Sequence, residues 1–498
     1  METKVYLIGA GTGDSSLITV KGAEILKKCT TLIYDRLVSL ELLMYVNPLC
    51  KIIYVGKEMG NHSVKQDEIN RILVEEAERG GIVVRLKGGD PFVFSRGGEE
   101  VEALIENNIP YEVISGVTSA VAVPASVGIP VTHRAMSRSF HVITGHTADN
   151  VSSTSDNFKT LAKLEGTLVF LMGVSNLLKI VENLIKKGKS PATPVAVISN
   201  GNTSAQKSVR GTLGDIVKKV SQANITAPAV IVIGDVAGLH LTTEEKKRLS
   251  GKKIGISGTR SFYSRMSELL KDEGAETVPV NIVETEEINR AKVLDAMRDI
   301  EHYSWLCFTS PNGVEAFFDT IADENIDLRI FSKIKFAVIG SSTAEMLKKR
   351  GFTADLMPTV FTGTALGEEM RKNIPTSERI LILRSKRSFA AITDILDFNR
   401  NKYEELDIYN TFSNKELTEE LTNNIPKLDM MVFASPYSVK SYFDIKNPYR
   451  LVRSSKLVAI GATTKEMLEK YDVGDILIPE KYTAEGILSL VLSQAENL

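Results

Sequence analysis

Short apolar runs alternate with amphipathic stretches along the whole chain. The apolar runs are strand-sized and bounded by polar or Gly-rich segments, whereas stretches such as 21–28 and 66–79 repeat apolar positions at helical spacing. This alternation is typical of α/β folds with largely parallel sheets, so we expect an α/β protein. In the first 115 residues the pattern predicts buried strands at Val5–Ile8, Thr31–Tyr34, Lys51–Val55, Ile82–Leu86 and Tyr111–Ile114.

A polar segment punctuated by glycine divides the chain into two halves. It runs from Thr242 to Lys253, and a new strand-like run, IGIS, follows it. This second beginning of the strand, Gly-turn and helix type predicts a fusion of two proteins. A Gly- and Pro-rich segment at 115–134 further predicts two lobes and a cleft in the first half. We expect lobes at 1–114 and 115–241, a linker at 242–251, and a second protein at 252–498.

The second half contains an internal repeat. FAVIGSSTAEMLKKRGF at 336–352 resembles LVAIGATTKEMLEKYDV at 457–473, and CFTSPNGVEAFF at 307–318 resembles VFASPYSVKSYF at 432–443. Each copy has the pattern of a strand, a turn and a helix. The second half is therefore predicted to be a pair of similar α/β lobes.

Bulk composition argues against nucleic-acid-binding, membrane-spanning and zinc-binding classes of protein. Hydrophobic residues make up 43% and charged residues 24% of the 498 residues, as in ordinary globular proteins. The net charge of −2 gives no global attraction to nucleic acid or an anionic membrane, and no apolar stretch reaches the ~18 residues of a membrane span. The three cysteines lack zinc-ligand spacing. We expect no metal, no signal peptide and a cytoplasmic location.

The segment LKGGDPFVFSRGGEE at 86–100 has the highest density of chemically informative residues in the first half. Its glycine pairs give a tight backbone path around a flat ligand, Asp90 can accept hydrogen bonds from a ribose or an amine, and Arg96 can pair with a carboxylate. Two weaker motifs precede it: YDRLVS at 34–39, and the loop GAGTGD at 9–14, which is not GxGxxG. A local salt bridge and helix cap is an alternative interpretation of the Asp-Arg pair in YDRLVS.

Two later segments complete this set of motifs. GVTSAVAVPASVGIPVTHR at 116–134 has small residues that let a cofactor pack against the backbone, and we interpret its His133 as structural rather than catalytic. TLVFLMGV at 167–174 ends a predicted strand with Met-Gly, and this methionine can also be simple core filling.

These motifs occur in the same order as in the uroporphyrinogen-III C-methyltransferases of the tetrapyrrole methylase family. The first 240 residues therefore resemble that family. The resemblance implies a two-lobed homodimer that binds S-adenosylmethionine between its lobes and releases S-adenosylhomocysteine. It implies proton transfer by Asp35 and Lys57, and a hold on the substrate by Arg96, Glu99 and Arg134. It implies cofactor contacts from Gly11, Thr12, Gly88, Gly89, Asp90, Val93, Thr118, Ser119, Met172 and Gly201.

Three positions depart from the family pattern. Thr12 stands where the family's GPGD has proline, Ser95 where FGRGGEE has glycine, and Ser115 where PGITS has proline. None of these changes removes a reactive group. Because loss of the first proline leaves the loop less rigid, we expect modestly weaker cofactor binding.

The second half offers hydroxyls and backbone amides rather than a catalytic cluster. Its sequence has no evident nucleophile–base pair, metal-ligand cluster or phosphate loop. Ser310, Thr343 and Thr463 each lie where a helix is predicted to begin. At such a position a hydroxyl can cap the helix while the free amides bind a carboxylate.

These segments, with SGTR at 257–260, FTGTALGEEM at 361–370, IYNT at 408–411 and IPEKYTAEGIL at 478–488, resemble uroporphyrinogen-III synthase over about 252–498. The resemblance implies two flavodoxin-like α/β lobes joined by a two-stranded connection, at 252–282 plus 412–498 and at 283–411. It makes Tyr409, which matches the family's interlobe tyrosine, the best candidate for the acid, with a structural role as the alternative. Backbone amides around Ser310, with Thr343 and Thr463, are expected to bind the carboxylates of the substrate.

The expected function is therefore bifunctional. The second half closes hydroxymethylbilane to uroporphyrinogen III, with inversion of the last ring and loss of water, and the first half transfers two methyl groups to that product, giving precorrin-2. Small tetrapyrroles are the expected partners, and nucleic acid and membranes are not. Two alternatives remain open. One is a nucleotide-dependent oxidoreductase in the first half, which the missing GxGxxG disfavours; the other is a non-catalytic ligand-binding module in the second half.

Overall fold

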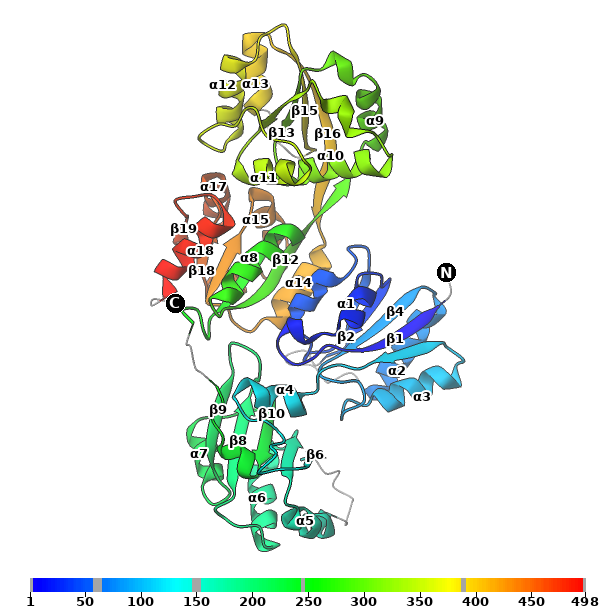
Figure 1. The fold of residues 1–498 in the computed structure, drawn as a ribbon, viewed down its shortest axis with the longest axis vertical. Helices are drawn as coiled ribbons and strands as arrows, with labels where there is room; N and C mark the ends of the chain where they lie inside the picture. The colour runs from blue at the N-terminus through cyan, green and yellow to red at the C-terminus, as the bar shows by residue number, and fades with distance from the viewer. Residues whose placement is uncertain (1–2, 57–64, 146–153, 243–246, 387–390, 496–498) are drawn as a thin grey trace. The chain divides into compact units, whose positions relative to one another are not determined.

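Strands and helices alternate through the described chain, which confirms the predicted α/β class (Figure 1). The structure is a computed structural model, and it describes residues 3–56, 65–145, 154–242, 247–386 and 391–495. By its internal contacts the chain divides into two compact units. Unit 1 contains residues 1–257, 262–281 and 416–498, and unit 2 contains residues 258–261 and 282–415.

The first sheet of unit 1 is parallel and has the strand order β3-β2-β4-β1-β5. Its five strands are the five apolar runs predicted from the sequence, with small shifts at their ends. The elements of this region are β1 (Lys4–Gly9), α1 (Val20–Leu26), β2 (Thr31–Tyr34), β3 (Lys51–Tyr54), α2 (Gln66–Glu78), β4 (Ile82–Lys87), α3 (Gly97–Glu106) and β5 (Tyr111–Ile114).

Helices α2 and α3 lie side by side and pack on this sheet (Figure 1). Their apolar stripes, including Leu73 of α2 and Leu104 of α3, are buried against strand residues such as Leu7 and Val83. Because all five strands are parallel, the loops at 10–14, 35–39 and 88–96 leave the sheet at one edge. The carboxyl edge of an open parallel sheet is where such folds bind ligands.

The second sheet of unit 1 is mostly antiparallel, so the prediction of largely parallel sheets is wrong for this region. In the order β6-β7-β10-β8-β9, β6 and β7 are parallel and the other pairs are antiparallel. The short loop at 200–206 joins β8 directly to β9, and such a loop cannot join parallel neighbours. The elements are α4 (Ser119–Ser126), β6 (Phe140–Thr144), α5 (Thr154–Lys163), β7 (Thr167–Leu171), α6 (Leu177–Lys186), β8 (Pro194–Ser199), β9 (Lys207–Thr212), α7 (Ile216–Gln222) and β10 (Ala229–Ile233).

Two separate apolar clusters form on this second sheet. One includes Leu184 of α6 and Ile216 of α7, and the other includes Ala120 and Val123 of α4. Helix α4 packs against β7 and β10. Because α4 follows directly on residues 116–118, its packing on the second sheet positions that part of the predicted cofactor site.

Unit 1 also contains a parallel set of strands in the order β11-β17-β18-β19. Helices α8 and α18 contribute to one apolar cluster on these strands, and α15 and α17 to another. The elements are β11 (Lys253–Thr259), α8 (Arg260–Asp272), α14 (Lys415–Asn424), β17 (Met430–Phe433), α15 (Pro436–Phe443), α16 (Tyr449–Val452), β18 (Lys456–Ala459), α17 (Ala462–Glu469), β19 (Ile476–Leu477) and α18 (Ala484–Ser493).

Unit 2 is built on parallel strands in the order β14-β13-β15-β16, and the end of β12 (Glu276–Glu287) pairs antiparallel with β16. Its β13–α10 and β14–α11 segments are the counterparts of β17–α15 and β18–α17, which confirms the internal repeat. The elements are α9 (Arg290–Arg298), β13 (Trp305–Phe308), α10 (Pro311–Asp323), β14 (Lys335–Val338), α11 (Ser341–Lys349), α12 (Gly363–Asn373), β15 (Arg379–Ser385), α13 (Ala391–Asn399) and β16 (Lys402–Ser413).

Two general features bear on the predicted class. Among the described residues, no helix combines the length and apolar character needed to cross a membrane. Cys29, Cys50 and Cys307 are buried free thiols.

Candidate active sites

Three glycine-containing loops meet at the carboxyl edge of the first sheet. Gly11 and Gly89 exchange backbone hydrogen bonds of 3.2 and 2.7 Å, and both have positive φ, at +74° and +71°. A Cβ atom on Gly116 would lie 2.2 Å from the Gly89 carbonyl oxygen, so only a residue without a side chain fits there. We call Gly9, Gly11, Gly89 and Gly116 the glycine junction.

Asp90 stabilises the glycine junction through hydrogen bonds to backbone N–H groups. Its Oδ2 accepts a hydrogen bond from the Gly116 N–H at 3.1 Å, and its Oδ1 accepts one from the Phe92 N–H at 2.8 Å. Each carboxylate oxygen has a further lone pair, so Asp90 can still accept a hydrogen bond from a ligand.

The other predicted cofactor residues have different surroundings. Thr118 caps α4, of which Ser119 is the first residue, and Val93 packs against the cluster that contains α4. Met172 has φ of +55° and is 51% exposed, so it is not core filling. Gly88 and Gly201 lie in tight packing, because an added Cβ would approach Leu37 to 2.7 Å and Val123 to 2.5 Å respectively.

Thr12 connects two loops of the first half. Its hydroxyl accepts a hydrogen bond from the Asn202 side-chain amide at 3.1 Å. Gly13, at φ of +71°, lies so close that an added Cβ would be 2.6 Å from the Gly201 carbonyl oxygen. A side-chain hydrogen bond is thus present at the position where the family pattern has the rigid proline.

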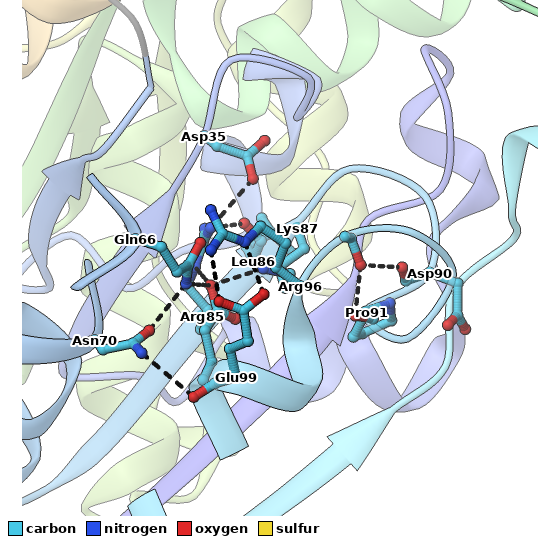
Figure 2. Close-up of polar contacts among 12 residues, drawn as sticks. Asp35, Gln66, Asn70, Arg85, Leu86, Lys87, Asp90, Pro91, Arg96 and Glu99 are labelled. Carbon is cyan, nitrogen blue, oxygen red and sulfur yellow. Dashed lines mark hydrogen bonds and ion pairs between the residues drawn. The ribbon is translucent and has the colours of Figure 1, made fainter. Parts of the chain in front are cut away.

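Asp35 directly follows β2, at the same edge of the sheet as the glycine junction. Its Oδ1 accepts a hydrogen bond from the Leu37 N–H at 3.2 Å, and its Oδ2 lies 3.3 Å from Nη2 of Arg85 (Figure 2). The Asp35 side chain is 28% exposed, so it can reach a ligand. Lys57, the predicted partner in proton transfer, lies outside the described residues.

A buried ionic network behind Asp35 was missed in the sequence analysis. Arg85 and Lys87 of β4 both contact Oε1 of Glu100 on α3, at 3.0 and 2.7 Å. Burial and the nearby Arg85 lower the pKa of Lys87. The available sequence signal was two cations within the otherwise apolar strand IVVRLK, because such residues are almost never fully buried unless they are paired.

Arg96 and Glu99 form an exposed pair at the beginning of α3 (Figure 2). The Arg96 Nε and Nη2 atoms lie 2.8 and 2.6 Å from the two carboxylate oxygens of Glu99. Arg96 has φ of +60°, and the neighbouring Ser95 hydroxyl donates to the carbonyl oxygens of Asp90 and Pro91. Ser95, which departs from the family glycine, therefore adds hydrogen bonds within the turn that presents Arg96.

Arg134 lines a polar cavity of about 560 Å³ together with Thr132, His133, Ser137 and Arg138. Arg134 and Arg138 are exposed, and neither forms an ion pair with a carboxylate of the described chain. His133 and Ser137 close a tight turn through backbone hydrogen bonds of 2.8 and 2.9 Å. The cavity therefore offers two guanidinium groups to an anionic ligand, and the His133 backbone helps to shape it.

Tyr409 and Ser310 are in contact in unit 2. Their hydroxyl oxygens lie 2.7 Å apart, and Ser310 also caps α10 by accepting a hydrogen bond from the Gly313 N–H at 3.0 Å. Tyr409 is 5% exposed, and burial raises the pKa of its phenol, an effect that hydrogen bonds to Ser310 and Ser385 oppose. A phenol carries its proton at neutral pH, so the Tyr409 hydroxyl is available as a proton donor, and burial makes it hold that proton more tightly.

The other two predicted carboxylate-binding residues of the second half differ from each other. Thr343, in the first turn of α11, is fully buried, and its Oγ1 has no hydrogen-bond partner among the residues described. Thr463, in the first turn of α17, is exposed and belongs to unit 1. The Thr343 hydroxyl is therefore not accessible to a ligand in this structure.

Two family models match the chain: tetrapyrrole (corrin/porphyrin) methylases over residues 4–217, and uroporphyrinogen-III synthase HemD over residues 264–489. The porphyrin biosynthesis protein HemD of Ruminiclostridium josui is 37% identical over 493 residues, 98% of this chain and 97% of that protein. The uroporphyrinogen-III C-methyltransferase of Methanocaldococcus jannaschii is 52% identical over 241 residues, 48% of this chain and 98% of that protein. A solved uroporphyrin-III C-methyltransferase from Thermus thermophilus, complexed with S-adenosylhomocysteine, is 34% identical with a TM-score of 0.41, covering 47% of this chain and 93% of that one.

The fold and the sites define an α/β enzyme with two consecutive catalytic halves. The chain belongs to the tetrapyrrole methylase family in its first half and to the uroporphyrinogen-III synthase family in its second half. It is a bifunctional enzyme of tetrapyrrole biosynthesis, which confirms the predicted family, enzyme class, substrate class and use of S-adenosylmethionine. Membership of the methylase family excludes the oxidoreductase alternative for the first half.

Proposed function

We propose that the second half converts hydroxymethylbilane to uroporphyrinogen III, and that the first half methylates this product twice to give precorrin-2. The observation that carries the proposal is the presence of both family matches in one chain. The two reactions are consecutive, because the product of the second half is the substrate of the first half. Fusion keeps the two activities in equal amounts and raises the local concentration of the intermediate.

The glycine junction fits S-adenosylmethionine. A Cβ on Gly89 would come no closer than 4.0 Å to the Ser119 nitrogen, so this face of the loop is open toward the beginning of α4. Asp90 offers acceptors for the ribose or the amine, and the exposed Met172 offers apolar contact. When bound, the cofactor supplies a methyl group activated by its sulfonium.

Asp35 supplies the base for methyl transfer. The bound cofactor would supply its methyl group to a pyrrole carbon, and the macrocycle would then carry the positive charge. Asp35 accepts the proton that the methylated macrocycle releases, which neutralises this charge. Positioning provides most of the rate enhancement for such an in-line displacement.

Cationic side chains hold the carboxylates of the substrate. Uroporphyrinogen III carries eight carboxylates, and Arg134 and Arg138 line one polar cavity without a carboxylate partner among the described residues. Arg96 exchanges its contact with Glu99 for a substrate carboxylate at little cost, because an exposed ion pair is worth only about 0–1 kcal/mol.

Tyr409 supplies the acid for ring closure. Its phenol donates a proton to the hydroxymethyl oxygen, and the carbon–oxygen bond breaks to release water. The resulting cation is attacked by the substituted carbon of the last pyrrole, which rearranges to the inverted ring and loses a proton. Ser310 holds the phenol in place through the 2.7 Å contact and, with the N-terminus of α10, binds a substrate carboxylate.

The proposed assembly is a cytoplasmic homodimer formed through the methylase half. Exposed apolar side chains of that half, including Phe92, Met136 and Phe140, are available for a subunit interface. Buried free thiols fit a reducing compartment. Sedimentation of the full chain at several concentrations measures the oligomeric state.

One assay tests the proposed function. The full chain is given hydroxymethylbilane with and without S-adenosylmethionine, and the products are resolved by mass and isomer. We expect uroporphyrinogen III without the methyl donor and a product two methyl groups heavier with it. Formation of only the uninverted type-I isomer would show that the second half is a non-catalytic binding module.

A further inference from the structure

The strand register gathers four charged side chains on one face of the first sheet. Ile33 of β2 pairs with Arg85 of β4 in parallel register, so Asp35, two residues later, is level with Lys87. Alternate residues of a strand point to the same face, which brings Asp35, Arg85 and Lys87 together. Glu100 of α3 completes the cluster, which we call the buried ion network. Figure 2 labels three of its members, Asp35, Arg85 and Lys87.

Arg85 is the member that connects this network to the active site. It is 3% exposed, and its Nε contacts Glu100 at 3.0 Å while its Nη1 donates to the Leu86 carbonyl oxygen at 3.0 Å. The remaining end, Nη2, lies 3.3 Å from Oδ2 of Asp35. Because Nε and Nη1 are held by Glu100 and Leu86, the guanidinium has little freedom to rotate, so its Nη2 fixes the direction in which the Asp35 carboxylate points.

Stability alone is a poor explanation for the buried ion network. Lys87 is 2% exposed and Glu100 is fully buried, and the Glu100 Oε2 atom has no hydrogen-bond partner among the described residues. Burying charges that are incompletely paired costs free energy. Well-packed apolar residues of similar volume often stabilise a fold at least as much as a buried ionic cluster does. The network is thus better explained by what it does for Asp35, its exposed end.

We propose that Arg85 is a positioning residue for methyl transfer, anchored by Glu100, which Lys87 also contacts, and that it acts by orienting the Asp35 carboxylate toward the macrocycle. This inference rests on the proposed role of Asp35 as the base. Arg85 itself touches neither substrate nor cofactor in this account. Its effect on turnover therefore passes entirely through Asp35.

A double-mutant cycle in the full chain tests this dependence. Methylation of uroporphyrinogen III is measured for Asp35→Asn, Arg85→Lys and the double variant, together with S-adenosylhomocysteine binding by calorimetry. We expect each single variant to lower kcat about 10²-fold, as loss of a general base does, with KM and S-adenosylhomocysteine affinity changed by less than about 3-fold. The double variant is expected to be no slower than Asp35→Asn, because residues that act as a unit are not additive.

Two further variants separate positioning from folding. Arg71→Lys makes the same substitution at an exposed arginine of α2 and is expected to leave kcat unchanged. If Arg85→Lys does not fold, the combined Arg85→Met, Lys87→Met and Glu100→Leu variant replaces the whole network with apolar side chains, which buried ionic clusters tolerate. We expect it to fold, bind S-adenosylhomocysteine and turn over as slowly as Asp35→Asn.

The outcomes are distinguishable. Loss of turnover in Asp35→Asn, with wild-type turnover in Arg85→Lys or in the folded apolar variant, would overturn the positioning role and leave the base intact. Fully additive losses in the double variant would overturn it as well. Wild-type turnover in Asp35→Asn would overturn both the base and the inference that depends on it.

Discussion

The Tyr409 and Ser310 hydroxyl oxygens lie 2.7 Å apart, and the same Ser310 oxygen accepts the Gly313 N–H at the beginning of α10. The phenol is therefore fixed relative to a helix N-terminus. From the sequence, both capping and carboxylate binding were expected at Ser310. The structure confirms capping, which places the proposed acid beside the N-terminus of α10.

Tyr409→Phe removes the proposed acid while keeping the ring. We expect the rate of ring closure to fall about 10²-fold, because a positioned acid contributes at least that much. The uninverted isomer should increase as spontaneous closure competes. Isomer-resolved chromatography after a short incubation with hydroxymethylbilane measures both effects.

Tyr403→Phe is the matched control for this substitution. Tyr403 lies on the same strand and also donates its hydroxyl to a neighbour, Asp397, at 2.7 Å. Tyr403→Phe removes the hydrogen bond to Asp397, whereas Tyr409→Phe removes those to Ser310 and Ser385, and each such bond is worth about 1 kcal/mol. Equal activity losses in the two variants would indicate a structural effect and argue against Tyr409 as the acid.

Buried phenols predict a loss of stability in alkali. Burial raises the pKa of Tyr409, and burial with a hydrogen bond to a carboxylate raises the pKa of Tyr303 and of Tyr403 to about 12. Above the ordinary tyrosine pKa of about 10, the unfolded chain releases these protons before the folded chain does. The folded state then holds more protons, so the free energy of unfolding falls as pH rises.

Urea denaturation at about pH 8 and about pH 11, with tyrosinate absorbance as a second probe, measures this dependence. The contribution of the three phenols to the free energy of unfolding should be constant below about pH 10 and decline above it. Tyr409→Phe should reduce the slope, since phenylalanine carries no proton to lose. A slope identical to that of the unmodified chain would show that Tyr409 ionises equally in both states.

Gly116→Ala should weaken cofactor binding. The new Cβ would lie 2.2 Å from the Gly89 carbonyl oxygen and 2.6 Å from Gly9 Cα. Both neighbours are backbone atoms, so the two loops would have to move apart to accommodate it. We expect S-adenosylhomocysteine affinity to fall more than 10-fold and stability to fall by about 1–3 kcal/mol from overpacking. Calorimetry and thermal unfolding measure the two effects.

Gly98→Ala is the control, because a Cβ there meets no atom within 4 Å and the residue is helical. It should bind normally and gain about 0.5–1 kcal/mol of stability. Normal binding in Gly116→Ala as well would show that the glycine junction can open without losing the cofactor.

Local pattern predicted the strands of the first sheet, because each is a continuous apolar run bounded by turns. The same reasoning could not reveal the buried ion network. Arg85 lies within one of those runs, and its contact with Asp35 depends on how β2 pairs with β4. Register between distant segments is set by packing and is not encoded in either segment alone.

Side-chain exposure and strand direction could not be predicted from local pattern either. Thr343 and Thr463 each lie in the first turn of a helix, but at positions one residue apart in the two repeats, so the first is fully buried and the second is exposed. The antiparallel second sheet follows from the connection between β8 and β9, whose apolar runs look the same in either direction. Motif order, by contrast, identified both families, because it depends on the sequence alone.

Thr12→Val tests whether the hydrogen bond to Asn202 compensates for the missing family proline. Valine keeps the shape of threonine but removes the acceptor that the Asn202 amide uses at 3.1 Å. Loss of a bond worth about 1 kcal/mol predicts a roughly 5-fold weaker S-adenosylhomocysteine affinity. Thr12→Ser keeps the hydroxyl and should bind within about 2-fold of the unmodified chain.

In an Asn202→Ala background the valine substitution should have no further effect, since the partner of the Thr12 hydroxyl is already absent. If valine weakens binding equally in both backgrounds, the hydroxyl acts on something other than Asn202 and the loops are held together by packing instead.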